Sequence, residues 1–167
     1  DWAIGSETQL AGPLSNRMGG YAAKYSCLEE EEGGGNTGGV VHYYPARWEE
    51  SIRWYEPMKG RILIARMKAA KERWVVGVYS PAREGKEKET FWKWIRVLRA
   101  HVEDEGIDAV WGGDWNAVSN PKKDRSSEGE WSSQGDKCMA RTMVGKVKEV
   151  TEGSGKTWAS EDGKRWA

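Results

Sequence analysis

The sequence lacks several features that would place it in a particular class. It has only two cysteines, Cys27 and Cys138, too few for a disulfide framework, which favours a reducing, intracellular setting. Its 26 basic and 26 acidic side chains cancel, so the whole chain carries no basic surplus for nucleic acid, although a local basic patch can still serve. No apolar run is long enough to cross a membrane, and we expect no membrane partner.

What remains is the composition of a polar globular domain. Hydrophobic residues make up 38% and charged residues 31% of the 167 residues, a length that suits one domain. Phenylalanine occurs once and tryptophan 11 times, so we expect strand cores to use tryptophan where phenylalanine is usual. The chain starts at Asp1 and stops at Ala167 without terminal structure signals. We therefore expect residues 1–167 to form a single partial domain, incomplete at both termini.

Two amphipathic helices are predicted. The first spans Glu87–Glu103, where apolar residues recur at helical spacing and basic residues lie between them. Gly106 is suited to ending this helix. The second spans Asp136–Val150, where methionines and valines fall on one face.

Short apolar runs predict several strands. Arg61–Arg66 and Arg73–Tyr79 are joined by a short polar connector and are expected to form a hairpin covered on both faces. Ile107–Trp111 follows the first helix as a further strand. Other strands are expected at 2–4, 21–28, 38–44 and 156–160, whereas 48–55 is ambiguous. This order is typical of an α/β fold in which helices cover sheets, with antiparallel neighbours wherever connectors are short.

The strongest candidate for chemistry is the segment Gly-Gly-Asp-Trp-Asn at 112–116, where an apolar strand ends. Side chains two residues apart point the same way in extended backbone, so Asp114 and Asn116 are predicted to address one point. The carboxyl end of a strand is a common place for ligand sites in α/β sheets. Glycine, aspartate and asparagine are also ordinary turn residues, so a plain strand-to-turn exit is the alternative.

Two further residues are candidates for the same site. Glu7 follows the apolar residues 2–4 and would supply a second carboxylate for a hard cation such as Mg²⁺. Tyr79 ends a strand just before Pro81, where its phenol would donate to a phosphate oxygen. The alternatives are a solvated surface glutamate and a tyrosine that closes a core strand before a proline.

Three segments, in this order and rough spacing, resemble the endonuclease/exonuclease/phosphatase (DNase I-like) superfamily. Ser-Glu-Thr-Gln at 6–9 resembles its Gln-Glu-Thr segment, Val-Tyr-Ser-Pro at 78–81 its Val-Tyr-Ala-Pro segment, and Gly-Gly-Asp-Trp-Asn its Gly-Asp-Phe-Asn segment. Each segment is weak evidence alone, and their joint order is more specific.

Three more segments resemble the non-LTR (LINE-type) retrotransposon endonucleases within that superfamily. Gly-Gly-Val at 38–40 is similar to a strand-opening segment of that branch, and Asp-Arg-Ser at 124–126 to the segment after its Gly-Asp-Phe-Asn loop. Thr-Trp-Ala-Ser at 157–160 is similar to its late Thr-Trp-x-Ser strand. The resemblance covers nearly the whole chain.

The resemblance implies a four-layer sandwich, with two mainly antiparallel sheets flanked by helices. It also implies hydrolysis of a phosphodiester by an activated water with Mg²⁺ or Mn²⁺ as cofactor. Glu7 would ligate the metal, and Asp114 would position or deprotonate the water. Asn116 would hold that water or a phosphate oxygen, Tyr79 would contact the scissile phosphate, and Thr157 would line the substrate site.

A basic segment follows the Gly-Gly-Asp-Trp-Asn loop. Lys122, Lys123 and Arg125 lie there, and Arg125 falls in the Asp-Arg-Ser segment, so these side chains are candidates for contacting a DNA backbone. Acidic residues lie among them, and a solvated loop of mixed charge is the alternative reading of the same segment.

The chain departs from the family pattern at several points. Ala82 stands where the family has an asparagine after Tyr-Ala-Pro, so one phosphate-binding amide is missing. The family's first strand with its asparagine, and its closing Asp and Asp-His segments, match nothing within these 167 residues. His42 and His101 match no motif; we expect His42 to be structural and His101 to lie on the surface.

Three functions stay open on the sequence. The first is a DNA-nicking endonuclease domain of a retrotransposon-type protein, nuclear if the element is active, with the isolated chain inactive. The second is a non-catalytic relic or binding domain, which zero net charge and Ala82 favour. The third is a phosphatase or phospholipid phosphodiesterase of the same superfamily. The partner is then DNA, RNA or another phosphodiester, and no obligate protein partner is inferred.

Overall fold

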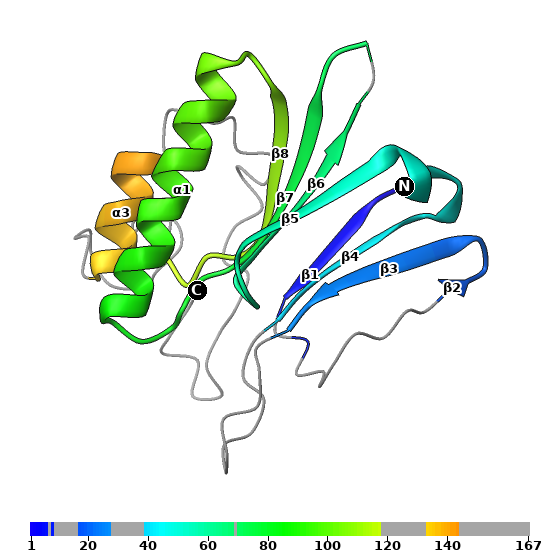
Figure 1. Cartoon of the computed structure of the whole chain (residues 1–167). Helices are drawn as coiled ribbons and strands as arrows, with labels where there is room; N and C mark the ends of the chain where they lie inside the picture. Colours follow the sequence, from blue (N-terminus) through cyan, green and yellow to red (C-terminus); the bar gives the residue numbers. More distant parts are fainter. Residues whose placement is uncertain (7, 9–16, 28–38, 69, 118–132, 144–167) are drawn as a thin grey trace, which may run out of the picture.

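A computed structural model describes residues 1–6, 8, 17–27, 39–68, 70–117 and 133–143, which form two sheets and two α-helices (Figure 1). The first sheet has the order β1-β4-β3-β2, and all its pairs are antiparallel. Its strands span Ala3–Ser6 (β1), Arg17–Met18 (β2), Tyr21–Ser26 (β3) and Val40–Pro45 (β4). A 3-10 helix, η1 (Ala46–Ser51), leads from β4 into the second sheet.

The second sheet has the order β5-β6-β7-β8. Its strands span Ile52–Met58 (β5), Ile62–Met67 (β6), Arg73–Tyr79 (β7) and Asp108–Asp114 (β8). The three pairs β5-β6, β6-β7 and β7-β8 are antiparallel, antiparallel and parallel in turn. The parallel pair needs a long crossover, which α1 (Lys86–Asp104) supplies. Because β7 and β8 run in the same direction, both strands end at the same edge of the sheet.

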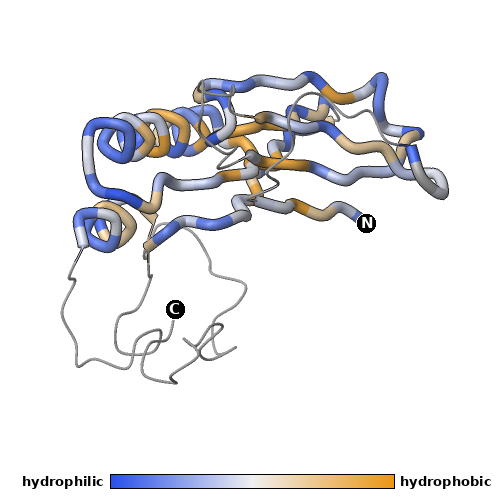
Figure 2. Tube along the Cα trace, turned by 90° about the horizontal axis from the view of Figure 1, so that it is seen from below, coloured by the Kyte–Doolittle hydropathy of each residue, from blue (hydrophilic) through white to orange (hydrophobic). Residues whose placement is uncertain are grey.

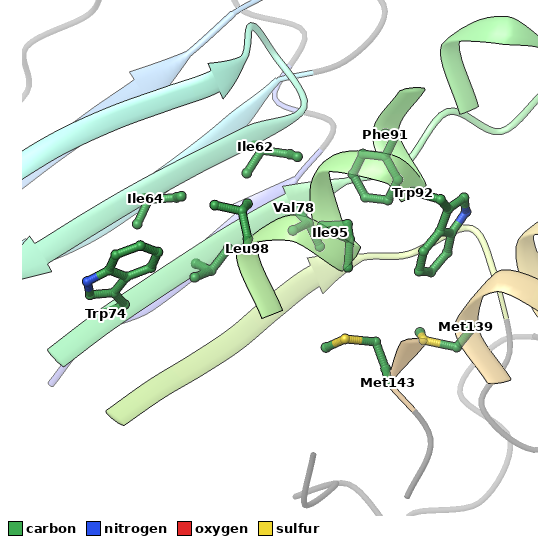
Figure 3. Packing of buried hydrophobic residues seen from close by; sticks show 11 residues of the cluster. Ile62, Ile64, Trp74, Val78, Phe91, Trp92, Ile95, Leu98, Met139 and Met143 are labelled. Atoms are coloured by element: carbon green, nitrogen blue, oxygen red, sulfur yellow. The ribbon is translucent and has the colours of Figure 1, made fainter. Parts of the chain in front are cut away.

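The helices α1 and α3 (Gln134–Thr142) lie on the same side of the strands in both views (Figures 1 and 2). Apolar side chains of α1 pack on β6 and β7 in the main core, with two methionines at the α3 end of the cluster (Figure 3). None of the helices in the described part has the length and apolar character needed to span a bilayer.

The space between the two sheets holds a second, more aromatic core. Trp2 stacks on Tyr44 and on Trp48, with ring centroids 5.5 and 6.1 Å apart, and Trp54 lies beside them. His42, from β4, is fully buried in this layer. Its Nε2 lies 3.1 Å from the carbonyl oxygen of Leu63, so the ring joins one sheet to the other.

The expected class, an α+β fold with two mainly antiparallel sheets and covering helices, is confirmed. Within the described residues the helices cover only the second sheet, so three of the four expected layers are seen. The expected hairpin is present as β6 and β7. The expected strand at 156–160 lies outside the described residues.

Several boundaries differ from the expectation. The ambiguous segment 48–55 divides into the end of η1 and the start of β5. Strand β8 extends to Asp114, past the expected end at Trp111, because its two glycines continue the pairing with β7. Helix α3 begins at Gln134, two residues early, because Ser133 caps it.

Candidate functional site

The candidate site lies at the edge of the second sheet where β7 and β8 both end. Tyr79, the last residue of β7, is the register partner of Asp114, the last residue of β8. The backbone N–H of Ser80 donates to the carbonyl oxygen of Asp114 at 2.8 Å, so the strands stay joined as they exit the sheet. Because register partners share a face, the side chains of Tyr79 and Asp114 leave the sheet on the same side.

That side faces the first sheet. Gly112 lies two residues before Asp114 on β8, and a Cβ added to it would lie 3.0 Å from Cδ1 of Ile4 in β1. Strand β1 packs against both β7 and β8. The site edge of the second sheet is therefore close to the strand that leads to Glu7.

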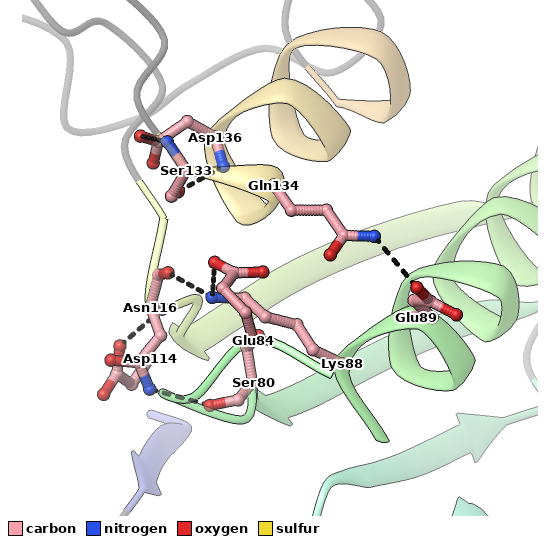
Figure 4. Close-up of polar contacts among 9 residues, drawn as sticks. All are labelled: Ser80, Glu84, Lys88, Glu89, Asp114, Asn116, Ser133, Gln134 and Asp136. Atoms are coloured by element: carbon pink, nitrogen blue, oxygen red, sulfur yellow. Dashed lines mark hydrogen bonds and ion pairs between the residues drawn. The ribbon is translucent and has the colours of Figure 1, made fainter. Parts of the chain in front are cut away.

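Asp114 and Asn116 are joined by a turn closed through the aspartate side chain (Figure 4). The backbone N–H of Asn116 donates to Oδ1 of Asp114 at 2.8 Å. The Asn116 Nδ2 group donates to the carbonyl oxygen of Ser80 at 2.7 Å, which ties the turn to the exit of β7. Among the described residues Oδ2 of Asp114 accepts no hydrogen bond, and the carboxylate is half-buried.

The expectation that Asp114 and Asn116 lie side by side on extended backbone is wrong. Strand β8 stops at Asp114, and Asn116 has φ of 43°, in the left-handed region. The two residues still meet, because an aspartate side chain often bonds to the backbone two residues on. The structure therefore shows the turn, and the turn brings the two candidate side chains together.

Gly113 is required by the close approach of β7. Its φ is 123°, and an added Cβ would overlap the carbonyl oxygen of Val78. Only a glycine combines this conformation with that contact.

Tyr79 is 6% exposed and packs between the sheets with Val40 and Leu63. The guanidinium carbon of Arg61 lies 4.8 Å from the centroid of its ring. The ring is therefore held on two sides at the edge that carries Asp114, which places a cation beside the proposed phosphate-contacting phenol.

Three of the predicted site residues lie outside the described residues: Glu7, Arg125 and Thr157. The neighbours of Glu7 are described. Oγ1 of Thr8 lies so close to Gly39, which has φ of 118°, that a Cβ there would overlap it. Thr8 and Gly39, which belong to the two segments at 6–9 and 38–40 used in the resemblance, are therefore adjacent in space. Ala82 is exposed in the connection after β7 and offers no amide to the site.

A hard cation is the cofactor that the sequence resemblance implies for this edge. Mg²⁺ is usually held by one or two carboxylates together with water and phosphate oxygens. The half-buried carboxylate of Asp114 lies at this edge, and Glu7, the metal ligand that the resemblance implies, lies outside the described residues. Within the described ranges no group of three His, Cys, Asp or Glu side chains is arranged to hold a metal.

Lys88 is a residue at this site that the sequence interpretation did not single out. It is 2% exposed, and its Nζ donates to Oε1 of Glu84 at 3.2 Å and to the carbonyl oxygen of Asn116 at 3.4 Å (Figure 4). A signal was present in the sequence. Lys88 lies three residues before Phe91 and seven before Ile95, on the apolar stripe of α1.

The two histidines have the expected environments, His42 inside the fold and His101 on the surface. His101 is exposed on α1. His42 is buried, and desolvation lowers its pKa to about 4, against a smaller opposing effect of the hydrogen bond with Leu63. It is therefore a neutral structural residue at ordinary pH.

No protein-family model matches the chain, and a search of curated proteins finds no match either. The resemblance to the endonuclease/exonuclease/phosphatase superfamily therefore remains a prediction from its sequence segments.

The left-handed turn at Asn116 gives a stability test. Asn116→Ala loses the bond to Ser80 and keeps a strained φ, whereas Asn116→Gly loses the bond and relieves the strain. We expect the alanine variant to be less stable than the glycine variant by about 1 kcal/mol. Urea unfolding measures the difference. Equal midpoints and slopes for the two variants would show that the φ of 43° is not maintained in solution.

Proposed function

We propose that the chain is part of a Mg²⁺-dependent phosphodiesterase domain that nicks DNA, of the retrotransposon endonuclease type. The observation that carries the proposal is the convergence of Asp114, Asn116 and Tyr79 at one sheet edge. These are the described members of the residue set that the resemblance implies. The register of β7 and β8, and not proximity along the chain, brings Tyr79 to the Asp114–Asn116 turn.

Each residue has a role that its contacts allow. Asp114 keeps Oδ1 on the Asn116 backbone, and Oδ2 is directed to the water that attacks phosphorus, as a general base. Asn116 uses one hydrogen of Nδ2 for Ser80, and the second serves the water or a phosphate oxygen. The phenol of Tyr79 contacts a non-bridging oxygen of the scissile phosphate. Glu7 would hold the cation, which would neutralise the charge that develops on phosphate.

A non-catalytic relic is the second candidate, and Ala82 is the observation that favours it. The connection after β7 presents a methyl group where the family has an amide for phosphate. Such a chain would keep the Asp114 turn as a structural feature and bind substrate weakly.

The test is nicking of supercoiled plasmid in Mg²⁺ buffer. It compares the 167-residue chain with whatever longer protein its gene encodes. We expect only the longer protein to nick. In it, Asp114→Asn should lower the rate by about 100-fold or more, as for loss of a general base. The matched control is Asp108→Asn at the other end of β8, where the exposed carboxylate pairs with Lys71 at 2.8 Å.

The outcomes separate the candidates. Full activity in the Asp108 variant with loss in the Asp114 variant supports the endonuclease. If the longer protein does not nick, the endonuclease proposal fails; hydrolysis of phosphomonoesters or phospholipids would then indicate the third candidate, and inactivity on all three the relic.

A further inference from the structure

The strongest unexplained feature of the molecule is a lysine buried on the apolar side of α1. Lys88 is 2% exposed, yet its neighbours along the stripe are Phe91, Trp92 and Ile95. Burying an ammonium group is costly, and an apolar residue of similar length would pack there without that cost. A contribution to core packing therefore does not account for the lysine.

The Lys88 ammonium connects the first turn of α1 to the exit loop of β8. Glu84, 47% exposed, lies four residues earlier and supplies the counter-charge at 3.2 Å. The other contact, at 3.4 Å, is to the carbonyl oxygen of Asn116, the residue held in the left-handed region. The charge therefore acts on the backbone of the residue that closes the Asp114 turn.

A third element packs against the same point. An added Cβ on Gly135, in the first turn of α3, would lie 2.9 Å from Nζ of Lys88 and 3.2 Å from the carbonyl oxygen of Asn116. The start of α3 is fixed by a reciprocal cap between Ser133 and Asp136, and Asp136 is fully buried (Figure 4). A glycine at 135 thus allows α3 to enclose the lysine and the loop.

We propose that Lys88 is a positioning residue, which holds the carbonyl of Asn116 and thereby sets the Asp114–Asn116 turn. The held carbonyl fixes the peptide plane after Asn116. The left-handed backbone at Asn116 then directs its N–H to Asp114 and its amide to Ser80. The consequence for catalysis rests on the proposed function, whereas the structural effect on the turn does not.

The test is hydrogen exchange at the Asn116 amide, followed by NMR in the full 167-residue chain. Lys88→Met keeps the length of the side chain and removes its charge and donors. We expect protection of the Asn116 amide to fall roughly tenfold or more, the scale of one lost charge-assisted hydrogen bond. Protection of the Val76 amide, in the core of β7, should fall by much less. The matched control is Lys93→Met, at an exposed position one turn further along α1.

A second variant approaches the turn from the other side. Gly135→Ala favours α3 intrinsically, because alanine is the better helix former, while its Cβ displaces the lysine and the carbonyl. It should reproduce the loss of protection at Asn116 without unfolding the chain. Unchanged protection at Asn116 in both variants would overturn the proposal, and so would an equal loss at Asn116 and Val76, which indicates general destabilisation.

The catalytic consequence is read in the longer protein. There Lys88→Met should lower kcat for nicking about tenfold with little change in KM, because the turn positions the water and not the bulk of the DNA. Loss of Asn116 protection in a protein that never nicks would support the positioning role and reject the endonuclease function. Nicking at the wild-type rate, despite lost protection at Asn116, would reject the catalytic consequence of the proposal and leave the structural effect on the turn intact.

Discussion

Replacing Gly113 with alanine should destabilise the fold by about 3 kcal/mol, from a strained φ together with an overpacked contact. The residue has φ of 123°, a conformation that alanine rarely adopts. The new Cβ would also overlap the carbonyl oxygen of Val78 in β7, and a backbone atom in a central strand has little freedom to move. The strain falls on the β7-β8 pair next to Asp114, so the site should be lost together with stability.

The matched control is Gly19→Ala. Gly19 has φ of 57° in the turn between β2 and β3, and an added Cβ there meets nothing within 4 Å. We expect a cost of about 1 kcal/mol, from the backbone conformation alone. Urea unfolding of both variants measures the difference. Equal losses at the two positions would contradict the close approach of β7 and β8 at Gly113.

Much of the fold could be predicted because its signals are local. The spacing of Phe91, Ile95 and Leu98 identifies α1, and the two apolar runs around a short polar connector identify the β6-β7 hairpin. The segment 48–55 is ambiguous in the sequence because it contains the junction of a 3-10 helix and a strand. It sustains neither a helical nor a strand repeat of apolar residues. The parallel pairing of β7 with β8 depends on how the crossover helix packs, which no short segment encodes.

At the candidate site, the positions of Asp114 and Tyr79 at strand ends could be predicted, but the geometry of the turn could not. Strand ends marked Asp114 and Tyr79, and the register brings them together. The turn at Asn116 is left-handed, which glycine and asparagine permit but do not require, so extended backbone was the wrong expectation. The sequence signals for Lys88 conflict. A lysine between other charged residues suggests a solvated helix face, whereas its position on the apolar stripe of α1 indicates a buried side chain.

The second large effect is a loss of stability in mild acid, caused by His42. Its ring is fully buried, and its pKa is lowered from 6.5 to about 4. The Leu63 carbonyl can only accept a hydrogen bond, so the neutral ring carries its hydrogen on Nε2 and donates it there. Nδ1 is then free to accept from the indole N–H of Trp2, at 3.0 Å. Protonation would place a second N–H on Nδ1, directly against that indole donor. The folded state therefore excludes the imidazolium, and the unfolded chain accepts it.

The sign follows from which state binds the proton. Between pH 6.5 and about 4 the unfolded chain is protonated at His42 and the folded chain is not, so stability rises with pH. The contribution of neutral His42 to the free energy of unfolding is fully present above pH 6.5. It declines as the pH falls toward 4, by about 3 kcal/mol over the whole interval. Glu72 and Asp108, whose pKa values are lowered chiefly by hydrogen bonds from Trp74 and Lys71, act in a more acidic range. Their contributions decline only below the ordinary values of 4.5 and 3.8.

Urea unfolding at intervals from pH 4.5 to pH 7.5 isolates the histidine. Within this window the free energy of unfolding of the wild-type chain should lose most of the His42 contribution as the pH falls. The His42→Gln variant should be less stable at pH 7.5, and its free energy of unfolding should be nearly independent of pH. His101→Gln, at an exposed position of α1, controls for the substitution itself and should follow the wild-type profile. A flat wild-type profile would mean that the imidazolium is tolerated between the sheets. The bonds of His42 to Trp2 and Leu63 would then not hold in solution, and the join between the sheets would have to depend on their aromatic contacts.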